Sequence, residues 1–188
     1  MKTRTILLSQ FGTRVGTRGE GRAAGQAVWE ELSALPAEGI LAVDLAGIEV
    51  LSGSFADEAL VDPLARLVGG ELPGRYLLVR APREDLLEDL EAKLAQRKLA
   101  LLAVVDGRAW RALGRLPPYL DESLRWIVAH GEATSGDLAG ALGVSPRAAA
   151  TRIAHLAALR LVHIVPHPRP VGGVEHHARS LVSVDGGP

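Results

Sequence analysis

Two helices joined by a tight turn are indicated in the C-terminal third of the chain, in the stretch GDLAGALGVSPRAAATRIAHLAALRLV. Thr134 and Asp137 stand three residues apart ahead of the first helix, which is the spacing of a reciprocal N-terminal cap. Gly143 can close that helix in the left-handed conformation, which glycine enters without strain. Ser145 is a favoured N-cap residue, and Pro146 suits the first position of the second helix, where no backbone N–H is needed. A short helix, a glycine turn and a longer helix predict a helix-turn-helix.

The second of these helices has two chemically distinct faces. One face carries apolar residues at three- and four-residue spacing and should pack inward: Ala149, Ile153, Leu156 and Ala157. The other carries cations, a hydroxyl, a methyl group and an imidazole with little bulk: Arg147, Ala148, Thr151, Arg152 and His155. Such a face can enter a DNA major groove, where arginine binds guanine edges or phosphates and methyl groups meet thymine. A solvated helix face in a small protein-binding bundle would show the same pattern, so both interpretations stay open.

Two β-type runs follow the helix pair and flank a loop rich in proline and glycine. LRLVHIVPHP reads as one strand, PHPRPVGGV contains the loop, and EHHARSLVSV reads as the other strand. With these runs, residues 120–182 resemble the winged-helix DNA-binding domains of bacterial regulators such as the MarR group. Arg160 stands where that family usually has a glycine before the wing. The resemblance implies duplex DNA as the partner, contacted by helix and wing residues: Ser145, Arg147, Thr151, Arg152, His155, His167, Arg169 and Arg179.

Charge is distributed unevenly over this half of the chain. Residues 145–183 contain five arginines and one acidic residue, whereas residues 121–144 contain one arginine and four acidic residues. All six histidines lie between His130 and His177, and they gain charge as the pH falls toward about 6.5, the ordinary histidine pKa. We therefore expect a local basic face with a salt-dependent attraction to phosphate, on a chain whose formal net charge is −1.

Composition limits the class of protein and its location. A chain of 188 residues can hold one large or two small domains, and a charged fraction of 23% without a long uncharged apolar run predicts a globular protein with no membrane span. MKTRTILLSQ leads into polar, glycine-rich sequence rather than into an apolar signal region. The absence of cysteine excludes disulfides, thiol catalysis and cysteine metal sites. We expect a cytoplasmic protein.

The first half of the chain alternates strand-like and helix-like segments. Its expected strands are residues 5–8, 40–45, 75–81 and 99–105, and its expected helices include residues 20–35 and 83–98. The Asp106-Gly107 pair predicts a type I′ hairpin turn, which returns residues 108–113 as an edge strand. Together these segments predict an α/β domain with a mixed sheet, residues 1–115. The segment GRLPP then marks the boundary to a winged-helix domain, residues 119–183.

The segment around the second expected strand resembles a known family. A short loop and a serine-capped helix follow that strand; we expect Ser54 and Asp57 as the N-cap pair, and Pro63 to kink or divide the helix. A Thr-Arg-x-x-Gly-Arg segment beginning at Thr17, together with VDLAGIEVLSGSFADEAL, is similar to a STAS-like family of unknown function with a Ser-Phe-Ala-Asp-Glu signature. The resemblance covers residues 1–113. It implies a STAS-like domain that senses a signal or docks a protein partner.

Several polar side chains near this signature are candidates for an anion or partner site: Arg14, Arg18, Arg22, Ser52 and Ser54. The arginines lie near a predicted helix start, where backbone N–H groups attract anions. In the STAS proteins that regulate sigma factors a serine of an Asp-Ser-Ser-Gly stretch is phosphorylated; Gly53 holds that position here, so the resemblance implies no phosphoswitch. The glycines of residues 12–25 match no nucleotide-binding loop, so a structural turn is favoured over a nucleotide site.

Patterns typical of catalysis, metal binding or cofactor binding are missing. One set of candidate metal ligands lies across the expected wing strands: His163, His167, His176, His177 and Glu175. No known ligand spacing supports it, and contacts of these histidines with phosphate are a simpler explanation. A second set, Asp44, Asp57 and Glu58, is explained by the preference for acids at a helix start. No nucleophile has a matched base. We expect no enzyme activity, no metal and no cofactor.

These observations predict a bacterial-type regulator that acts as a homodimer. An event at the STAS-like domain would change how the winged helices bind duplex DNA. The alternative is a protein-interaction adaptor of a signalling or defence system, in which the winged helix docks protein instead of DNA. The two are distinguished by whether residues 145–179 form one contiguous basic patch.

Overall fold

The computed structural model describes residues 1–168 and 172–183. The chain divides into two compact units, of which the first runs from Met1 to Leu116 and the second begins at Pro117. The division falls inside the GRLPP segment. Within the described residues, no helix combines the length and the apolar character that crossing a membrane requires.

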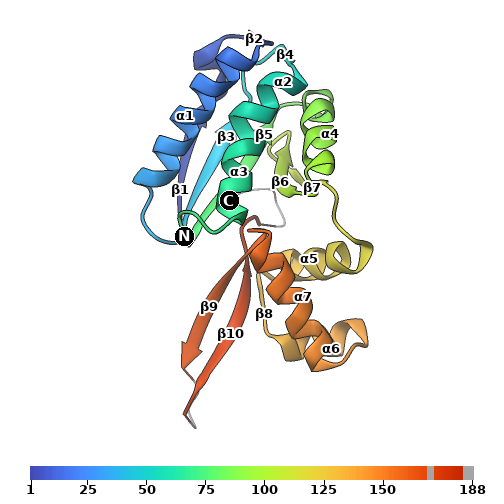
Figure 1. Ribbon diagram of the computed structural model, residues 1–188. Coiled ribbons are helices and arrows are strands. Elements are labelled where there is room, and N and C mark those ends of the chain that lie inside the picture. Colours follow the sequence, from blue (N-terminus) through green and yellow to red (C-terminus); the bar gives the residue numbers. More distant parts are fainter. Residues whose placement is uncertain (169–171, 184–188) are drawn as a thin grey trace. The chain divides into compact units, whose positions relative to one another are not determined.

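The first unit is an α/β structure built on a five-stranded mixed sheet (Figure 1). The strands lie in the order β1-β3-β5-β6-β7, with the bounds β1 (Lys2–Leu7), β3 (Gly39–Asp44), β5 (Arg75–Ala81), β6 (Ala100–Val105) and β7 (Ala109–Gly114). The first four strands are parallel, with Lys2 opposite Gly39 and Gly39 opposite Arg75, and β7 returns antiparallel to β6. A separate parallel ladder joins β2 (Arg14–Val15) to β4 (Val50–Leu51).

The turn between β6 and β7 has the predicted chemistry. Asp106 and Gly107 both have positive φ, 51° and 65°, and the N–H of Arg108 donates to the carbonyl oxygen of Val105 at 3.0 Å. These are the features of a type I′ turn, so the hairpin at the sheet edge is confirmed.

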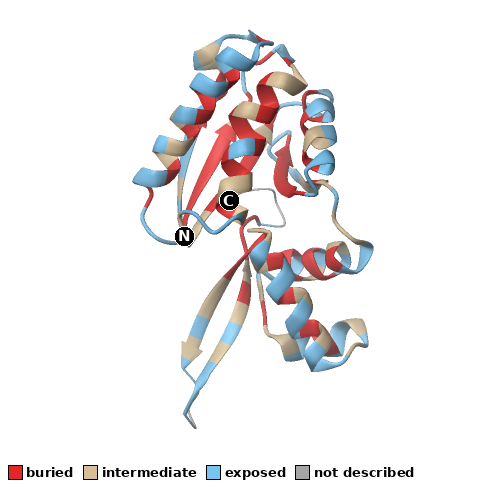
Figure 2. Cartoon of the chain, in the orientation of Figure 1, coloured by how far each residue is buried: buried red, intermediate tan, exposed pale blue. Residues whose placement is uncertain are grey.

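Helical segments connect the strands: η1 (Leu8–Phe11), α1 (Arg18–Ala34), α2 (Gly53–Ala56), the π-helical turn η2 (Asp57–Val61), α3 (Asp62–Val68), η3 (Glu84–Leu87) and α4 (Glu88–Gln96). Helices α1, α3 and α4 lie over the same face of the sheet (Figure 1). Their buried stripes face the strands and their outer faces are exposed (Figure 2).

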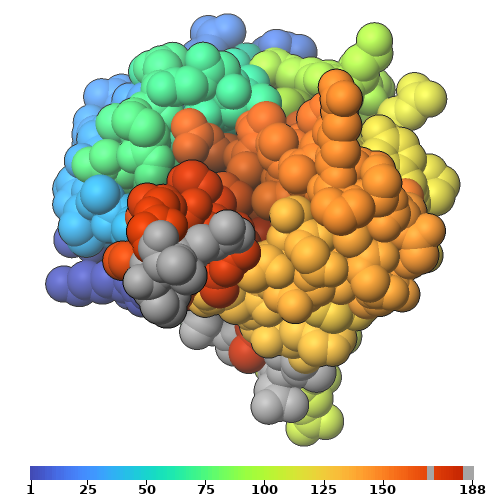
Figure 3. Space-filling model, turned by 90° about the horizontal axis from the view of Figure 1, so that it is seen from below, coloured from blue at the N-terminus to red at the C-terminus, as the bar shows by residue number. Residues whose placement is uncertain are grey.

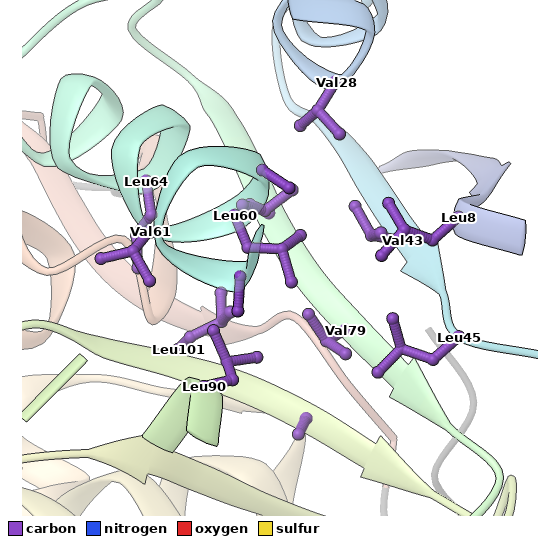
Figure 4. Close-up of a cluster of buried hydrophobic side chains, with 14 of the residues drawn as sticks. Leu8, Val28, Val43, Leu45, Leu60, Val61, Leu64, Val79, Leu90 and Leu101 are labelled. Carbon is purple, nitrogen blue, oxygen red and sulfur yellow. The ribbon is translucent and has the colours of Figure 1, made fainter. Parts of the chain in front are cut away.

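The core of this unit forms between these helices and one sheet face. Alternate strand residues, including Val43 and Val79, share one buried cluster with helical residues, as expected because successive side chains of a strand point to opposite faces. Figure 4 shows Leu60 and Leu64 projecting into this cluster from the run that η2 and α3 form, and Leu90 projecting from α4. This core fixes the helices relative to the sheet.

Helix α1 begins two residues earlier than expected because its N-terminus is capped. The hydroxyl of Thr17 accepts from the N–H of Glu20 at 3.2 Å, and the Glu20 carboxylate accepts from the N–H of Thr17 at 2.9 Å. Hydrogen bonds from the N–H and the hydroxyl of Thr17 to this carboxylate lower the pKa of Glu20. Gly21 and Gly25 lie inside the helix, within the expected range of residues 20–35. Cβ atoms at these positions would stand 2.9 Å from Phe55 O and 2.3 Å from Glu58 O, so the glycines allow α1 and the α2–η2 run to approach closely.

The central helical run is capped by Ser52, so the prediction of Ser54 as the N-cap is wrong. The Ser52 hydroxyl accepts from the N–H of Phe55 at 3.2 Å and donates to the carbonyl oxygen of Gly16 at 2.7 Å. Helical backbone begins at Gly53, directly after β4, which places Ser54 inside the first turn. The π-helical turn ends at Val61 and regular α-helix begins at Asp62. Pro63 lies in the first turn of α3, so the helical run is divided next to this proline, as expected.

The second unit combines three helices with a three-stranded sheet. Its elements are α5 (Pro118–His130), β8 (Glu132–Ala133), α6 (Ser135–Leu142), α7 (Pro146–Ala158), β9 (Val162–Pro168) and β10 (Val174–Ser180). The sheet is antiparallel in the order β8-β10-β9, with Val162 opposite Ser180 and Ala133 opposite Ala178. Buried residues of all three helices, among them Leu124, Leu138, Ala149 and Leu156, form its core.

Candidate nucleic-acid interface

Local caps hold α6 and α7 in place, as the sequence predicts. Thr134 and Asp137 form a complete capping box: the Thr134 hydroxyl accepts from the N–H of Asp137 at 3.0 Å, and the Asp137 carboxylate accepts from the N–H of Thr134 at 2.9 Å. Hydrogen bonds from the Thr134 hydroxyl and N–H lower the pKa of Asp137. Gly143 ends α6 with φ 64°, and the Ser145 hydroxyl accepts from the N–H of Ala148 at 3.2 Å. The start of each helix and the turn between α6 and α7 are therefore set by local hydrogen bonds and by Gly143.

The outer face of α7 presents polar groups to solvent. Ser145, Arg147, Thr151 and His155 are all exposed, and they border a shallow hollow of about 410 Å³ beside Tyr119. The Arg147 guanidinium and the His155 imidazole make no hydrogen bond or ion pair with any residue that the structure describes. The surface of α6 and α7 is continuous in the space-filling view, where it is coloured orange (Figure 3). This face offers one arginine, one imidazole and two hydroxyls to a ligand.

Arg152 does not belong to that exposed set, which corrects the prediction. Its side chain is only 17% exposed. Its Nη1 lies 3.3 Å from Glu122 Oε2 and from Ser123 Oγ, and 3.4 Å from the carbonyl oxygen of Tyr119. The guanidinium also lies 5.4 Å from the centre of the Tyr119 ring. Arg152 therefore joins α7 to α5.

The predicted wing cations are also held by the protein. Arg179 Nε donates to Glu132 Oε2 at 2.8 Å, and His167 Nε2 lies 2.9 Å from Glu132 Oε1. Burial alone would raise the pKa of Glu132, but its bonds with Arg179 and His177 outweigh that effect and lower it. Arg179 is therefore hydrogen-bonded to a carboxylate, and His167 lies within ion-pair distance of the same group. Arg169 lies outside the described residues.

The cations of the second unit thus fall into separate groups. Arg147 and His155 lie on the outer face of α7, whereas His167 and Arg179 gather around Glu132 on the sheet. Because acidic residues neutralise Arg152 and Arg179, the described part of residues 145–179 does not present all its cations as one free basic patch. Among the cations predicted to contact DNA that the structure describes, Arg147 and His155 on α7 are the exposed ones without an acidic partner.

The candidate anion site of the first unit is not a cluster of free cations. Arg18 and Arg22 both pair with Glu58, at 3.1 and 3.4 Å, and Arg14 pairs with Glu49 at 3.3 Å. The Ser52 hydroxyl is occupied by its two backbone partners, and Ser54 lies in the first helical turn. The structure brings Arg18 and Arg22 together around Glu58 but leaves Arg14 with a different partner.

Comparison of the chain with models of protein families, with curated proteins and with solved structures finds no match. What the second unit can do must therefore be argued from its own geometry.

Sequence reasoning missed the acidic partners of these cations. Glu132 lies on β8, a strand of two residues that no periodicity could reveal, and Glu122 lies 30 residues before Arg152. The excess of acidic residues in residues 121–144 could have indicated these ion pairs, because acidic and basic residues in excess within one small unit tend to pair.

Proposed function

We propose that the second unit is a winged-helix domain that binds duplex DNA, with α7 as the recognition helix. The order of its elements supports this: helix, short strand, helix, helix and a two-stranded hairpin, with the short strand pairing the hairpin. Arg160 has a left-handed φ of 61°, a conformation that favours glycine, at the position where the resembled family has glycine. The hairpin of β9 and β10 then corresponds to the wing.

The observation that carries the proposal is the exposed face of α7. Arg147 lies in the first turn of the helix, where backbone N–H groups also point outward and attract phosphate. Arginine at this position can bind a phosphate or the O6 and N7 acceptors of guanine. Thr151 presents a methyl group suited to thymine, and His155 adds an imidazole that can form a hydrogen bond with a base edge or a phosphate. Small neighbours such as Ala148 leave room for a close approach to the bases.

Because the proposed DNA-binding face has few cations, we expect the affinity for DNA to depend only weakly on salt concentration. Each neutralised phosphate contributes a slope of about −0.9 in log K against log salt, so two or three contacts give a slope of about −2 to −3. Affinity for a single site would then be modest, and a homodimer that binds two half-sites would raise it. In this proposal the STAS-like first unit, acting as a sensor or docking domain, changes how the two recognition helices are presented.

Fluorescence anisotropy with labelled duplex DNA tests the proposal. The 188-residue chain should bind mixed genomic fragments, and it should bind them more weakly at high salt than at low salt. Arg147→Ala should weaken binding by about 1–3 kcal/mol if it contacts a base, or reduce the salt slope by about one if it contacts a phosphate. Arg125→Ala is the matched control, because Arg125 is an exposed arginine of α5 paired with Asp121. Equal binding by both variants and the wild type would refute the proposed role of α7.

The alternative function is a protein-interaction adaptor. The neutralisation of Arg152 and Arg179 by acidic residues favours it, since a dedicated DNA-binding surface would keep more cations free. Absence of DNA binding at low salt, together with capture of a defined protein partner that Arg147→Ala abolishes, would support the adaptor.

A further inference from the structure

Three potential metal ligands meet on the sheet of the second unit, one from each strand. Glu132 belongs to β8, His167 to β9 and His177 to β10, and one ligand atom from each lies within 4.8 Å of the others. His177 Nδ1 lies 2.8 Å from Glu132 Oε1, and His167 Nε2 lies 2.9 Å from the same oxygen. The two imidazole rings stack with their centres 4.1 Å apart. Two imidazole nitrogens and one carboxylate oxygen thus lie close together on one face of the sheet.

His167 Nε2 is the unusual atom of this group. It is shielded from solvent, and the described residues provide no aligned hydrogen-bond partner for it despite its short distance to Glu132. A buried polar atom without a partner is costly, and a metal ion is one of the species that can satisfy it. The charge of the neighbouring carboxylate also favours a cation at this position.

We propose that Glu132, His167 and His177 form a binding site for a divalent first-row transition-metal ion. Two imidazoles and one carboxylate are a ligand set used for Zn²⁺, and also for Fe²⁺ when they occupy one face of an octahedron. Two ligand atoms that are each ~2.05 Å from an ion and at right angles are ~2.9 Å apart, which matches both measured distances from Glu132 Oε1. Three protein ligands leave the remaining positions of the ion open to water or a ligand.

Neighbouring residues supply the outer contacts that such a site needs. Arg179 Nε binds Glu132 Oε2 at 2.8 Å, which leaves Oε1 directed at the two histidines. His177 Nε2 lies 3.5 Å from Glu175 Oε2, the carboxylate–histidine arrangement that orients a metal-bound imidazole and raises its basicity. Glu132 faces Arg179 across the ladder of β8 and β10, and Glu175 faces His167 across that of β10 and β9. An ion at this point would link all three strands of the sheet.

The test is metal titration of the untagged 188-residue chain after treatment with a chelator. Isothermal titration with Zn²⁺ and visible absorption with Co²⁺ should both show one ion per chain. His167→Ala and Glu132→Gln should lower the affinity at least about tenfold. His176→Ala is the matched control, because His176 is an exposed histidine next to His177 on β10 but points to the other face of the strand. Its affinity should equal that of the wild type.

Two further readouts separate a built site from adventitious binding by histidines. Glu175→Gln, which removes only an outer contact, should still bind but with about 10- to 100-fold lower affinity. Zn²⁺ should raise the thermal midpoint of the wild type and of His176→Ala but not that of His167→Ala. Absence of binding by the wild type, or equal affinity in His167→Ala, Glu132→Gln and His176→Ala, would overturn the proposal.

Discussion

The close approach of α1 to the π-helical turn predicts a large effect for the small substitution Gly25→Ala. A Cβ at residue 25 would stand 2.3 Å from Glu58 O, whereas ordinary contact begins near 3.4 Å, and the atom it meets is backbone. Overpacking of this kind costs about 1–3 kcal/mol, and the severity of the overlap places it at the upper end. The higher helix propensity of alanine offsets about 1 kcal/mol of this loss in the free energy of unfolding. We therefore expect a net loss of about 2 kcal/mol, or a fall of about 4–8 °C in Tm for a chain of this size.

Gly19→Ala provides the matched control for this substitution. It lies on the same helix, and a Cβ at that position would have no heavy atom within 4 Å. It should leave Tm unchanged or raise it slightly. Thermal melts by circular dichroism measure both variants, and hydrogen exchange should show the loss of protection in Gly25→Ala concentrated in α1 and in residues 57–61. Equal Tm values for the two variants, or exchange that spreads evenly over the chain, would refute the argument from close packing.

Three further predictions concern the second unit. Gly143→Ala should lower Tm by the equivalent of about 1 kcal/mol, because φ at residue 143 is 64°, whereas Gly140→Ala, which has open space around it inside α6, should not. Arg152→Ala should lower the urea midpoint, because it removes contacts with α5, whereas Arg147→Ala, with an exposed side chain, should leave that midpoint unchanged. The pKa of Glu132 lies below its ordinary value of 4.5, so its contribution to stability is complete above pH 4.5 and is lost as the pH falls through the lower folded value. Melts from pH 7 to pH 3 should therefore show a smaller acid-induced loss for Glu132→Gln than for the wild type.

The accuracy of the sequence predictions depends on the distance over which each signal acts. The caps of α6 and α7 are confirmed because Thr134 and Ser145 each bond an N–H three residues ahead, so the whole signal lies within one turn. The N-cap of the central helical run was misplaced for the opposite reason. Ser52 and Ser54 have the same capping chemistry, and the end of β4 together with the carbonyl of Gly16 decides between them.

In the candidate interface, the contacts that the sequence did not predict are also contacts between residues far apart in the chain. Periodicity identified the outer face of α7, but the partners of its cations come from distant elements: Glu122 is 30 residues from Arg152, and Glu132 is 47 residues from Arg179. Composition indicated an excess of acids and of bases in this half of the chain. Only the folded arrangement shows which of them neutralise one another.

The two proposals for the second unit are linked by charge. In the structure, the Glu132 carboxylate offsets the charge of the Arg179 guanidinium. A divalent ion bound by these ligands would add two positive charges to the three-stranded sheet without moving any arginine. The cations of α7 would then be joined by a second centre of positive charge on the sheet, and the attraction of the unit to phosphate would increase. If the second unit binds DNA as proposed, Glu132 would oppose that binding without a metal ion and, with an ion bound, would hold the charge that strengthens it.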